Sequence, residues 1–392
     1  MRFRRSLLIF SWCALAGQQF AAAQPAPFAD AKVIHTLPWN SNVISAVAFI
    51  GNDKVAAGNK NGDILIWNLP AKGSDKLEPV RRLVGHTGAI NRLLVTPDGK
   101  TLISASNDRT LRYWDALSDA GEPGKVVLND GTPLKGVVEK VDKLPNLPPA
   151  HEVKVVVQKP IKELTGHKEW IQALAVSSEG TRLVSGDDQG IIIVWDLPAG
   201  KELNRWQCKD WVRSLAISPD GKTVAVSQHR PGRDKIVVPP SFHFWEIETG
   251  KMNVDLTKEI TGGMSAVAYS PDGKRLAMCR GNIEQEGPTG KVTLLDPSTG
   301  KKIREFTPGH SRGANDIAFH PDGKHLFSAG RDQLVKIWQL EDGKLVRDLG
   351  KFAERGYWIT SISISPDGRL LAAADDNERK VLIYTLSPSF NQ

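Results

Sequence analysis

The side chains of this chain that are best suited to chemistry are histidines and aspartates that recur together. His86 precedes Asp108, and His310 precedes Asp332, in two similar stretches of the sequence. A histidine oriented by an aspartate can act as a general base when a nucleophile stands beside it. Because the same combination appears in separate stretches and no nucleophile accompanies it, we favour a structural role for these residues over a catalytic one.

Other signatures of catalysis or cofactor binding are weak or absent from the sequence. Gly99-Lys100-Thr101 and Gly221-Lys222-Thr223 look like the end of a phosphate-binding loop, but both lack the required earlier glycine and both fall in turns. The sequence contains no Cys-x-x-Cys-His, His-Glu-x-x-His or Gly-x-Ser-x-Gly motif. Cys208 and Cys279 fall in different repeats, so we expect free thiols. We therefore expect no catalytic residue, no metal site and no cofactor.

A repeated turn indicates the elements that position these side chains. Proline fixes the first turn position, aspartate bonds its own backbone, and glycine supplies the positive φ. Each copy lies between two runs of alternating apolar and polar residues, which is the pattern of a β-hairpin. The copies of Pro-Asp-Gly-Lys or Pro-Asp-Gly-Arg begin at Pro97, Pro219, Pro271, Pro321 and Pro366.

Two further marks accompany these turns. An aromatic or apolar residue, usually followed by a polar one, comes after each turn, and Gly-His pairs precede three of the repeats. The first series is Trp67-Asn68, Trp114-Asp115, Trp195-Asp196, Trp245-Glu246, Leu295-Asp296, Trp338-Gln339 and Tyr384-Thr385. The Gly-His pairs are Gly85-His86, Gly166-His167 and Gly309-His310. This set of marks resembles the WD40 (WD-repeat) β-propeller family.

The resemblance implies an all-β, seven-bladed propeller over residues 24–392. The last repeat ends at its third strand, so we expect an N-terminal strand, Ala31 to Leu37, to complete the last blade and close the ring. The resemblance also implies a buried hydrogen-bonded network of Trp, Ser, His and Asp within a repeat. The residues are His86, Ser104, Asp108 and Trp114, then His310, Ser328, Asp332 and Trp338, then His167, Ser185 and Trp195. In the third set Gln189 stands where the acid is expected, and Asp188 is one position early.

Three segments depart from the repeat. An insertion at about residues 116–159 separates the third and fourth strands of the second blade, and we expect it on the bottom face of the propeller. Its two apolar runs, Lys125 to Leu128 and Val153 to Val157, could form a small hairpin. Lengthened loops at His229 to Ser241 and Arg280 to Gly290 belong to the top face. Such loops on a rigid scaffold are often functional, although insertion at a tolerant surface site is an equal alternative.

Tryptophan is unusually common, with 11 Trp against 4 Tyr. Trp170, Trp211 and Trp358 share one repeat position just before the first strand of a blade, on the top face near the channel. Trp and Arg are enriched at interface hot spots, so we predict a partner-binding patch of Trp170, Trp211, Arg213, Tyr357 and Trp358. Packing of these rings between blades is the alternative.

The first residues have the pattern of an export signal. Arg2, Arg4 and Arg5 precede a short apolar run, and Ala21 to Ala23 supply a cleavage site. The run is too short to span a membrane, so we expect a signal peptide at residues 1–23, with the Sec or the twin-arginine route left open. The net charge of +7 is a weak bias rather than a nucleic-acid footprint.

These observations favour a non-catalytic protein–protein interaction scaffold that is exported to a bacterial periplasm or cell surface. We expect a protein or peptide partner, no nucleic acid, no stable membrane insertion after cleavage, and a monomer. Either the top rim or the insertion could hold the partner. The alternative is a propeller enzyme or small-ligand binder with a site at the channel mouth, as in lactonases or quinone-dependent dehydrogenases. Asn91, Asn315 and Asp316 are its candidate residues.

Overall fold

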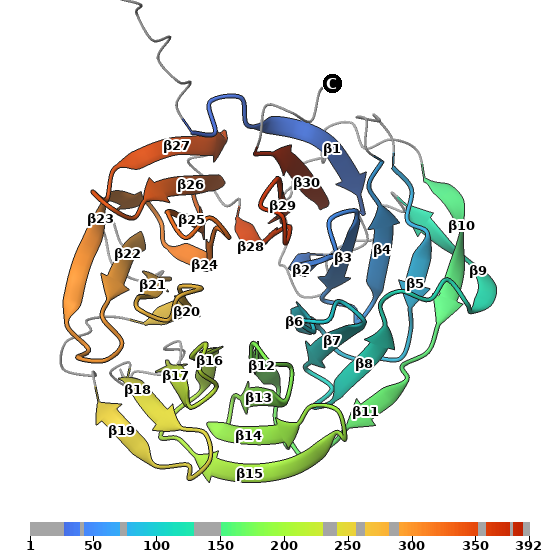
Figure 1. Cartoon of the computed structure of the whole chain (residues 1–392). Coiled ribbons are helices and arrows are strands. Elements are labelled where there is room, and N and C mark those ends of the chain that lie inside the picture. Colours follow the sequence, from blue (N-terminus) through green and yellow to red (C-terminus); the bar gives the residue numbers. More distant parts are fainter. Residues whose placement is uncertain are drawn as a thin grey trace, which may run out of the picture.

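The strands of the chain form seven sheets that surround a central channel as the blades of a propeller (Figure 1). This computed structural model describes residues 27–39, 43–70, 77–128, 150–229, 241–255, 263–281, 290–351, 358–376 and 379–386. Within those ranges the chain forms strands and turns without a helix, so no described helix could cross a membrane. The predicted signal peptide at residues 1–23, the interior of the two top loops and Tyr357 lie outside the described residues.

Each blade has four strands, called a to d here from the channel outward. Blades 1 and 2 contain β2 (Ile44–Ile50), β3 (Lys54–Asn59), β4 (Ile64–Asn68) and β5 (Arg81–Leu83), then β6 (Ile90–Val95), β7 (Thr101–Ser106), β8 (Leu111–Asp115) and β11 (Lys162–Leu164). Blades 3 and 4 contain β12 (Ile171–Val176), β13 (Arg182–Asp187), β14 (Ile191–Asp196) and β15 (Lys201–Gln207), then β16 (Val212–Ile217), β17 (Thr223–Gln228), β18 (Ser241–Glu246) and β19 (Met252–Asp255). Blades 5 and 6 contain β20 (Met264–Tyr269), β21 (Leu276–Arg280), β22 (Gly290–Leu295) and β23 (Lys302–His310), then β24 (Ala314–Phe319), β25 (His325–Gly330), β26 (Leu334–Gln339) and β27 (Leu345–Gly350).

Blade 7 joins the two ends of the described chain. It contains β28 (Ile359–Ile364), β29 (Leu370–Asp375) and β30 (Lys380–Thr385), and β1 (Lys32–Pro38) pairs antiparallel with β30 as its outer strand. The prediction of a seven-bladed propeller closed by an N-terminal strand is therefore confirmed. Closure pairs the outer edge of β30, which would otherwise be exposed.

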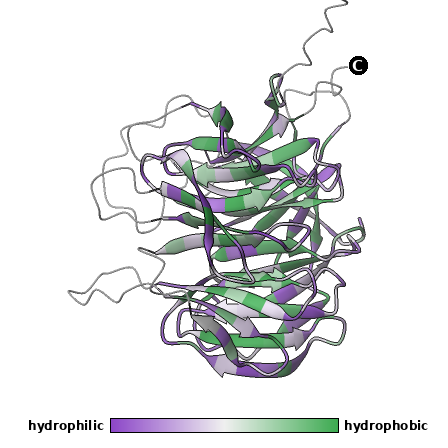
Figure 2. Cartoon of the chain, turned by 60° about the vertical axis from the view of Figure 1, so that its left-hand side comes forward, coloured by the Kyte–Doolittle hydropathy of each residue, from purple (hydrophilic) through white to green (hydrophobic). Residues whose placement is uncertain are grey.

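The repeated turns connect strands a and b at one end of each blade. At Pro97-Asp98-Gly99-Lys100, the Asp98 carboxylate accepts hydrogen bonds from the Thr96 hydroxyl at 2.6 Å and from the Lys100 N–H at 3.1 Å. Gly99 has a φ of 73°, which a side chain would disfavour. We call the end of the blades with these turns the bottom face and the opposite end the top face. Hydrophilic residues concentrate at such turns and hydrophobic residues along the strands (Figure 2).

The core consists of apolar clusters between neighbouring blades. Strand b is almost fully buried in every blade, and its glycines permit close approach of the next blade. A Cβ atom at Gly58 would lie 2.5 Å from the side chain of Ile90, and one at Gly186 would lie 2.4 Å from that of Val212. The blades are therefore packed backbone against side chain, which makes the ring a rigid support for its surface residues.

The insertion of blade 2 forms a hairpin, but not where the sequence suggested. β9 (Glu122–Leu128) and β10 (His151–Gln158) pair with each other, and β10 continues the sheet of blade 1 by a short parallel ladder with β5. The hairpin therefore lies along the outer edge of blade 1 instead of projecting from the bottom face (Figure 1). Residues 129–149 of the insertion lie outside the described residues.

Candidate interaction surface

The predicted His, Ser, Asp and Trp residues of blades 2 and 6 lie together in the structure. In blade 2 His86 Nδ1 is 2.7 Å from Asp108, His86 Nε2 is 2.7 Å from Ser104 Oγ, and the Trp114 ring N–H donates to Ser104 at 2.8 Å. The set in blade 6 has the same contacts at 2.8 to 2.9 Å, among His310, Ser328, Asp332 and Trp338.

These distances are those of a Ser-His-Asp catalytic triad, with Ser104 and Ser328 at the place of a nucleophile. What separates the network from a triad is access, because Ser104 and Ser328 are both fully buried. Their Oγ atoms also accept a tryptophan N–H, which occupies a lone pair that a nucleophile needs. Burial lowers the pKa of His86, and hydrogen bonding to His86 and Thr110 outweighs burial to lower the pKa of Asp108. A neutral histidine thus bridges a carboxylate to a serine inside the blade.

Blade 3 also has a complete network, but its acid is not at the position that the repeat pattern predicted. His167 Nδ1 lies 2.7 Å from Asp187, not from Asp188 or Gln189, and His167 also contacts Ser185, which accepts the N–H of Trp195. Asp187 is the last residue of β13, two positions before the place where the other blades carry their acid. Alternate residues of a strand share one face, so Asp187 faces the same way as Ser185, and Asp188 does not.

The three rim tryptophans occupy equivalent positions at the top face. The backbone carbonyl of each accepts a hydrogen bond from the residue that follows strand b, at 3.0 Å for Trp170, Trp211 and Trp358 alike. Trp170 is 50% exposed, whereas the side chains of Trp211 and Trp358 are more deeply buried. Trp170 and Trp211 lie on neighbouring blades, but Trp358 is on blade 7, across the ring, where the Arg331 guanidinium lies 4.5 Å from its ring centroid. The predicted patch is therefore split, with its adjacent pair on blades 3 and 4.

Two positions after each rim residue, a polar side chain connects neighbouring blades. In five blades this side chain donates to the carbonyl of the first strand a residue of the next blade. The pairs are Ser45 with Ile90, Asn91 with Ile171, Ser265 with Ala314, Asn315 with Ile359, and Thr360 with Ile44. Asn91 and Asn315, which were candidates for an enzyme site, are thus engaged in holding the ring together.

Blades 3 and 4 differ at this position. Gln172 donates instead to Asp188 at 3.1 Å, and Arg213 interacts electrostatically with the same carboxylate. Burial raises the pKa of Asp188 to about 6 in spite of both contacts. Within the described residues, Asp188 Oδ1 and Asp210 Oδ2 are buried atoms without a hydrogen-bond partner. A strongly perturbed carboxylate in a partly desolvated position is a marker of functional sites, and the sequence offered no signal for it beyond the rim tryptophans.

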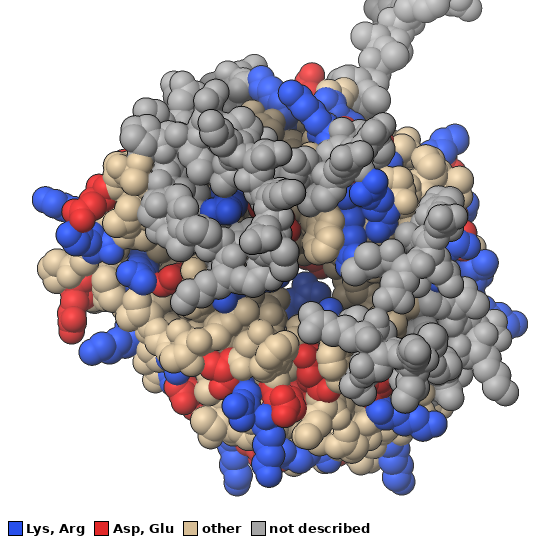
Figure 3. Space-filling view, turned by 180° about the vertical axis from the view of Figure 1, so that it is seen from behind, with Lys and Arg blue, Asp and Glu red and all other residues tan. Residues whose placement is uncertain are grey.

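The channel opening carries both charges. Figure 3 shows basic side chains inside the opening and acidic side chains gathered beside it. The charge of Arg213 acts on Asp188 and lowers the pKa of that carboxylate, against the effect of burial. Within the described ranges no group of three or more His, Cys, Asp or Glu side chains is arranged to hold a metal ion. Cys208 and Cys279 are buried and unpaired.

The chain is built from repeats that form a seven-bladed β-propeller, and blades 2, 3 and 6 contain the same buried network of His, Ser, Asp and Trp. A family model described as WD domain, G-beta repeat, matches residues 77–115, 158–196, 300–339 and 346–384. The chain belongs to the WD40 β-propeller family.

Several characterised proteins are similar to this chain. It is 24% identical to WD repeat-containing protein 1 of Gallus gallus, over 79% of this chain and 63% of that protein. It is 26% identical to Protein groucho of Drosophila melanogaster, over 57% of this chain and 28% of that protein. It is 24% identical to Small ribosomal subunit protein RACK1 of Caenorhabditis elegans, over 77% of this chain and 92% of that protein. The chain therefore spans less than two thirds of the first two relatives.

Proposed function

We propose that this protein is a non-catalytic interaction scaffold whose top face binds a protein or peptide partner over blades 3 and 4. The observation that carries the proposal is the break in the ring of inter-blade hydrogen bonds at Gln172 and Arg213. Five blades use this position to stabilise the ring, whereas in these two the side chains interact with the desolvated carboxylate of Asp188, whose backbone N–H bonds to Trp170.

The chemistry of this surface suits a protein partner. Trp170 presents a large rigid ring with half its area exposed, and such rings act as anchors in interfaces. The neighbouring loop residues Asp188 and Asp210 each keep a carboxylate oxygen without an internal partner in the described part of the chain. The other oxygen of Asp188 accepts a hydrogen bond from Gln172, and the other oxygen of Asp210 accepts the backbone N–H of Trp211. Both carboxylates therefore position residues of this surface.

The proposal includes an extracytoplasmic setting in a bacterium. It is supported by the basic, apolar and small-residue pattern of residues 1–23. N-terminal sequencing of the protein recovered from the periplasm or medium should give a chain that begins at Gln24. Recovery from the cytoplasm with Met1 or Arg2 intact would contradict this part of the proposal.

A site-specific crosslinking experiment in cells tests the binding surface. A photoreactive amino acid at position 170 should give one discrete crosslinked partner. The matched control is position 203, because Leu203 is 47% exposed on the outer strand of the same blade. A third probe at Val127, 38% exposed on β9, reports on the insertion.

Binding of the identified partner to the purified protein then tests whether the top face is the binding surface. Trp170→Ala should weaken binding by about tenfold or more, and Leu203→Ala should leave it unchanged. Crosslinking from position 127 alone, or full binding by Trp170→Ala with its stability retained, would overturn the top-face assignment.

A further inference from the structure

The lower half of the central channel is a chamber that the top-face function does not use. The cavity has a volume of about 650 Å³ and is bounded by strand a of the blades and by bottom-face turns. Pro97, Gly99 and Pro366 lie at its lower rim. This volume falls within the range of pockets that bind small molecules.

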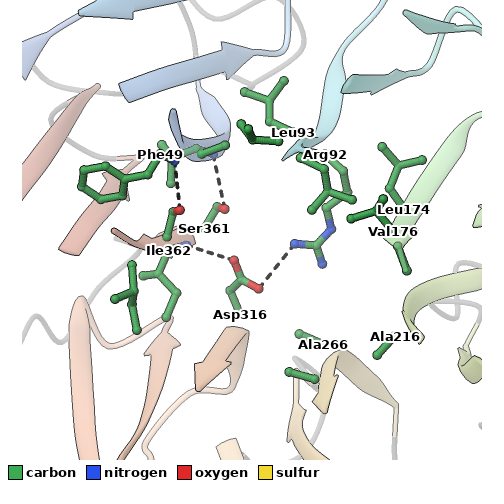
Figure 4. A pocket seen from close by; sticks show the side chains of 18 of the residues that line it. Phe49, Arg92, Leu93, Leu174, Val176, Ala216, Ala266, Asp316, Ser361 and Ile362 are labelled. Atoms are coloured by element: carbon green, nitrogen blue, oxygen red, sulfur yellow. Dashed lines mark hydrogen bonds and ion pairs between the residues drawn. The ribbon is translucent and has the colours of Figure 1, made fainter. Parts of the chain in front are cut away.

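The charged groups that line this chamber lie at one end. Arg92, Ser214, Asp316 and Ser361 occupy the same position on strand a of their blades and form its roof. Arg92 and Asp316 reach toward one another across the channel (Figure 4), with 3.4 Å between Nη1 and Oδ1. Below the roof the walls are mainly apolar. The wall residues include Val95, Leu174, Val176, Ile217, Val267 and Ile364.

The roof has an excess of hydrogen-bond donors. Asp316 is already supplied by the backbone, since its two oxygens accept the N–H groups of Ile317 at 3.1 Å and Ile362 at 2.9 Å. Ser214 and Ser361 each accept a backbone N–H from the next blade. The Arg92 side chain is 25% exposed, and its contact to Asp316 is long for a hydrogen bond. Its guanidinium, which has five N–H donors, therefore keeps donors for a ligand.

The charges around the roof also favour an anion. The charge of Arg92 lowers the pKa of Arg213, and the charge of Arg213 lowers that of Arg331, so the three cations act on one another. The carboxylates that accompany them are Asp188 above and Asp316 beside Arg92. Burial and the charge of Arg213 together lower the pKa of Arg331 to about 10, as expected for cations that crowd one another.

We propose that this chamber binds a small amphipathic carboxylate, with its acid group on Arg92 and its apolar body along the channel walls toward the bottom face. A linear alkyl carboxylate fits the arrangement because one end of the chamber is polar and its walls are apolar. Entry from the bottom face keeps this site separate from the top-face surface. Carboxylate binding in the chamber and partner binding at the top face can therefore be tested independently.

Calorimetric titration of the purified protein with decanoate tests the proposal. We expect one decanoate per propeller, and binding of 1-decanol weaker by about tenfold or more because its head group carries no charge. Arg92→Met keeps the apolar stem and removes the charge, so it should weaken decanoate binding by about tenfold or more and abolish the preference over decanol. Arg92→Lys should retain most of the preference.

Two further variants separate a specific site from general surfactant binding. Arg182→Met removes an arginine from β13, away from the chamber lining, and should bind decanoate like the unmodified protein. Ala268→Leu fills the chamber from its wall and should weaken both probes while thermal unfolding stays cooperative. Absence of decanoate binding, several equivalents bound per chain, or equal affinity for decanoate and decanol in the unmodified protein would overturn the assignment.

Discussion

His167 Nδ1 lies 2.7 Å from the carboxylate of Asp187, and that carboxylate also accepts the backbone N–H groups of Gln189 and Ile191 at 2.9 Å each. Asp187 therefore links the buried histidine of blade 3 to the turn between strands b and c. The same double role belongs to Asp108 in blade 2, where the second oxygen accepts the N–H of Thr110. The acid is thus a structural element of the turn as well as of the network.

Asp187→Ala should lower the free energy of unfolding by about 3 kcal/mol, because it leaves a buried histidine and two turn amides without their acceptor. Asp188→Ala is the matched control, since its side chain belongs to the top surface and not to the network. Urea unfolding of both variants at neutral pH measures the difference. Equal losses for the two variants would contradict the assignment of Asp187 as the network acid.

Asp188 should make stability depend on pH with an unusual sign. Its pKa is raised to about 6, chiefly by burial, so the folded state holds this proton more tightly than the unfolded state does. The stability that this proton contributes is present at about pH 4 and is lost as the pH rises through about 6. Asp188→Asn removes the penalty, so relative to the unmodified protein it should gain about 2 kcal/mol between pH 4 and pH 7.5.

The control for this measurement is Asp98→Asn in an exposed turn. The hydrogen bond from Thr96 lowers the pKa of Asp98, so its charged form is favoured by folding and its substitution should show no such gain. Urea unfolding of all three proteins at both pH values gives the comparison. A difference between Asp188→Asn and the unmodified protein that does not change with pH would show that Asp188 titrates normally.

Much of the fold was predictable because its information is local and repeated. Pro-Asp-Gly turns mark five of the seven blades, and an aromatic or apolar mark occurs once in every blade. The missing last strand matched a strand before the first turn, as the β1–β30 pairing confirms. Asp187 was missed because alignment by spacing placed the acid at Gln189. Strand alternation alone would have favoured Asp187 over Asp188, since only Asp187 lies on the face of Ser185.

The attachment of the insertion and the contents of the channel could not be predicted from local patterns. The β10–β5 ladder is parallel and only three residue pairs long, so no local hairpin pattern in the sequence predicts it. The Arg92–Asp316 pair joins residues 224 positions apart and depends on the ring having closed. Trp170 is 50% exposed whereas Trp211 and Trp358 are more deeply buried, and the repeat position that all three share does not predict this difference.

The N-terminal strand should be an integral part of the propeller. Leu37 on β1 is fully buried in the cluster that joins blades 7 and 1, so Leu37→Ala should lower the free energy of unfolding by about 3 kcal/mol. Val33 on the same strand is 41% exposed, and Val33→Ala should cost less than about 1 kcal/mol. Urea unfolding distinguishes the two, and similar small losses would mean that β1 adds little to the closure of the ring.

Arg81 should control how firmly the inserted hairpin is held. Its guanidinium is buried and donates to three carbonyls of the chain that leaves blade 2, those of Asp115, Ala116 and Ser118. Arg81→Met removes this donor, although the Ser118 carbonyl keeps Gln158 as a second one. The hairpin remains joined to blade 1 by the short β10–β5 ladder and by Leu128, Val153 and Val155 in the apolar cluster. We expect amide hydrogen exchange in β9 and β10 to accelerate by about tenfold or more, with β24 to β26 of blade 6 unaffected.

The adjacent residue provides the control for this effect. Arg82 is about a third exposed and pairs with Asp63 at 2.7 Å, so Arg82→Met removes a surface ion pair, for which the expected loss is below about 1 kcal/mol. Exchange in β9 and β10 should then change little. Equal acceleration in the two variants would mean that the hairpin responds to general loosening of β5, whereas acceleration in Arg81→Met alone would assign its anchoring to the buried guanidinium.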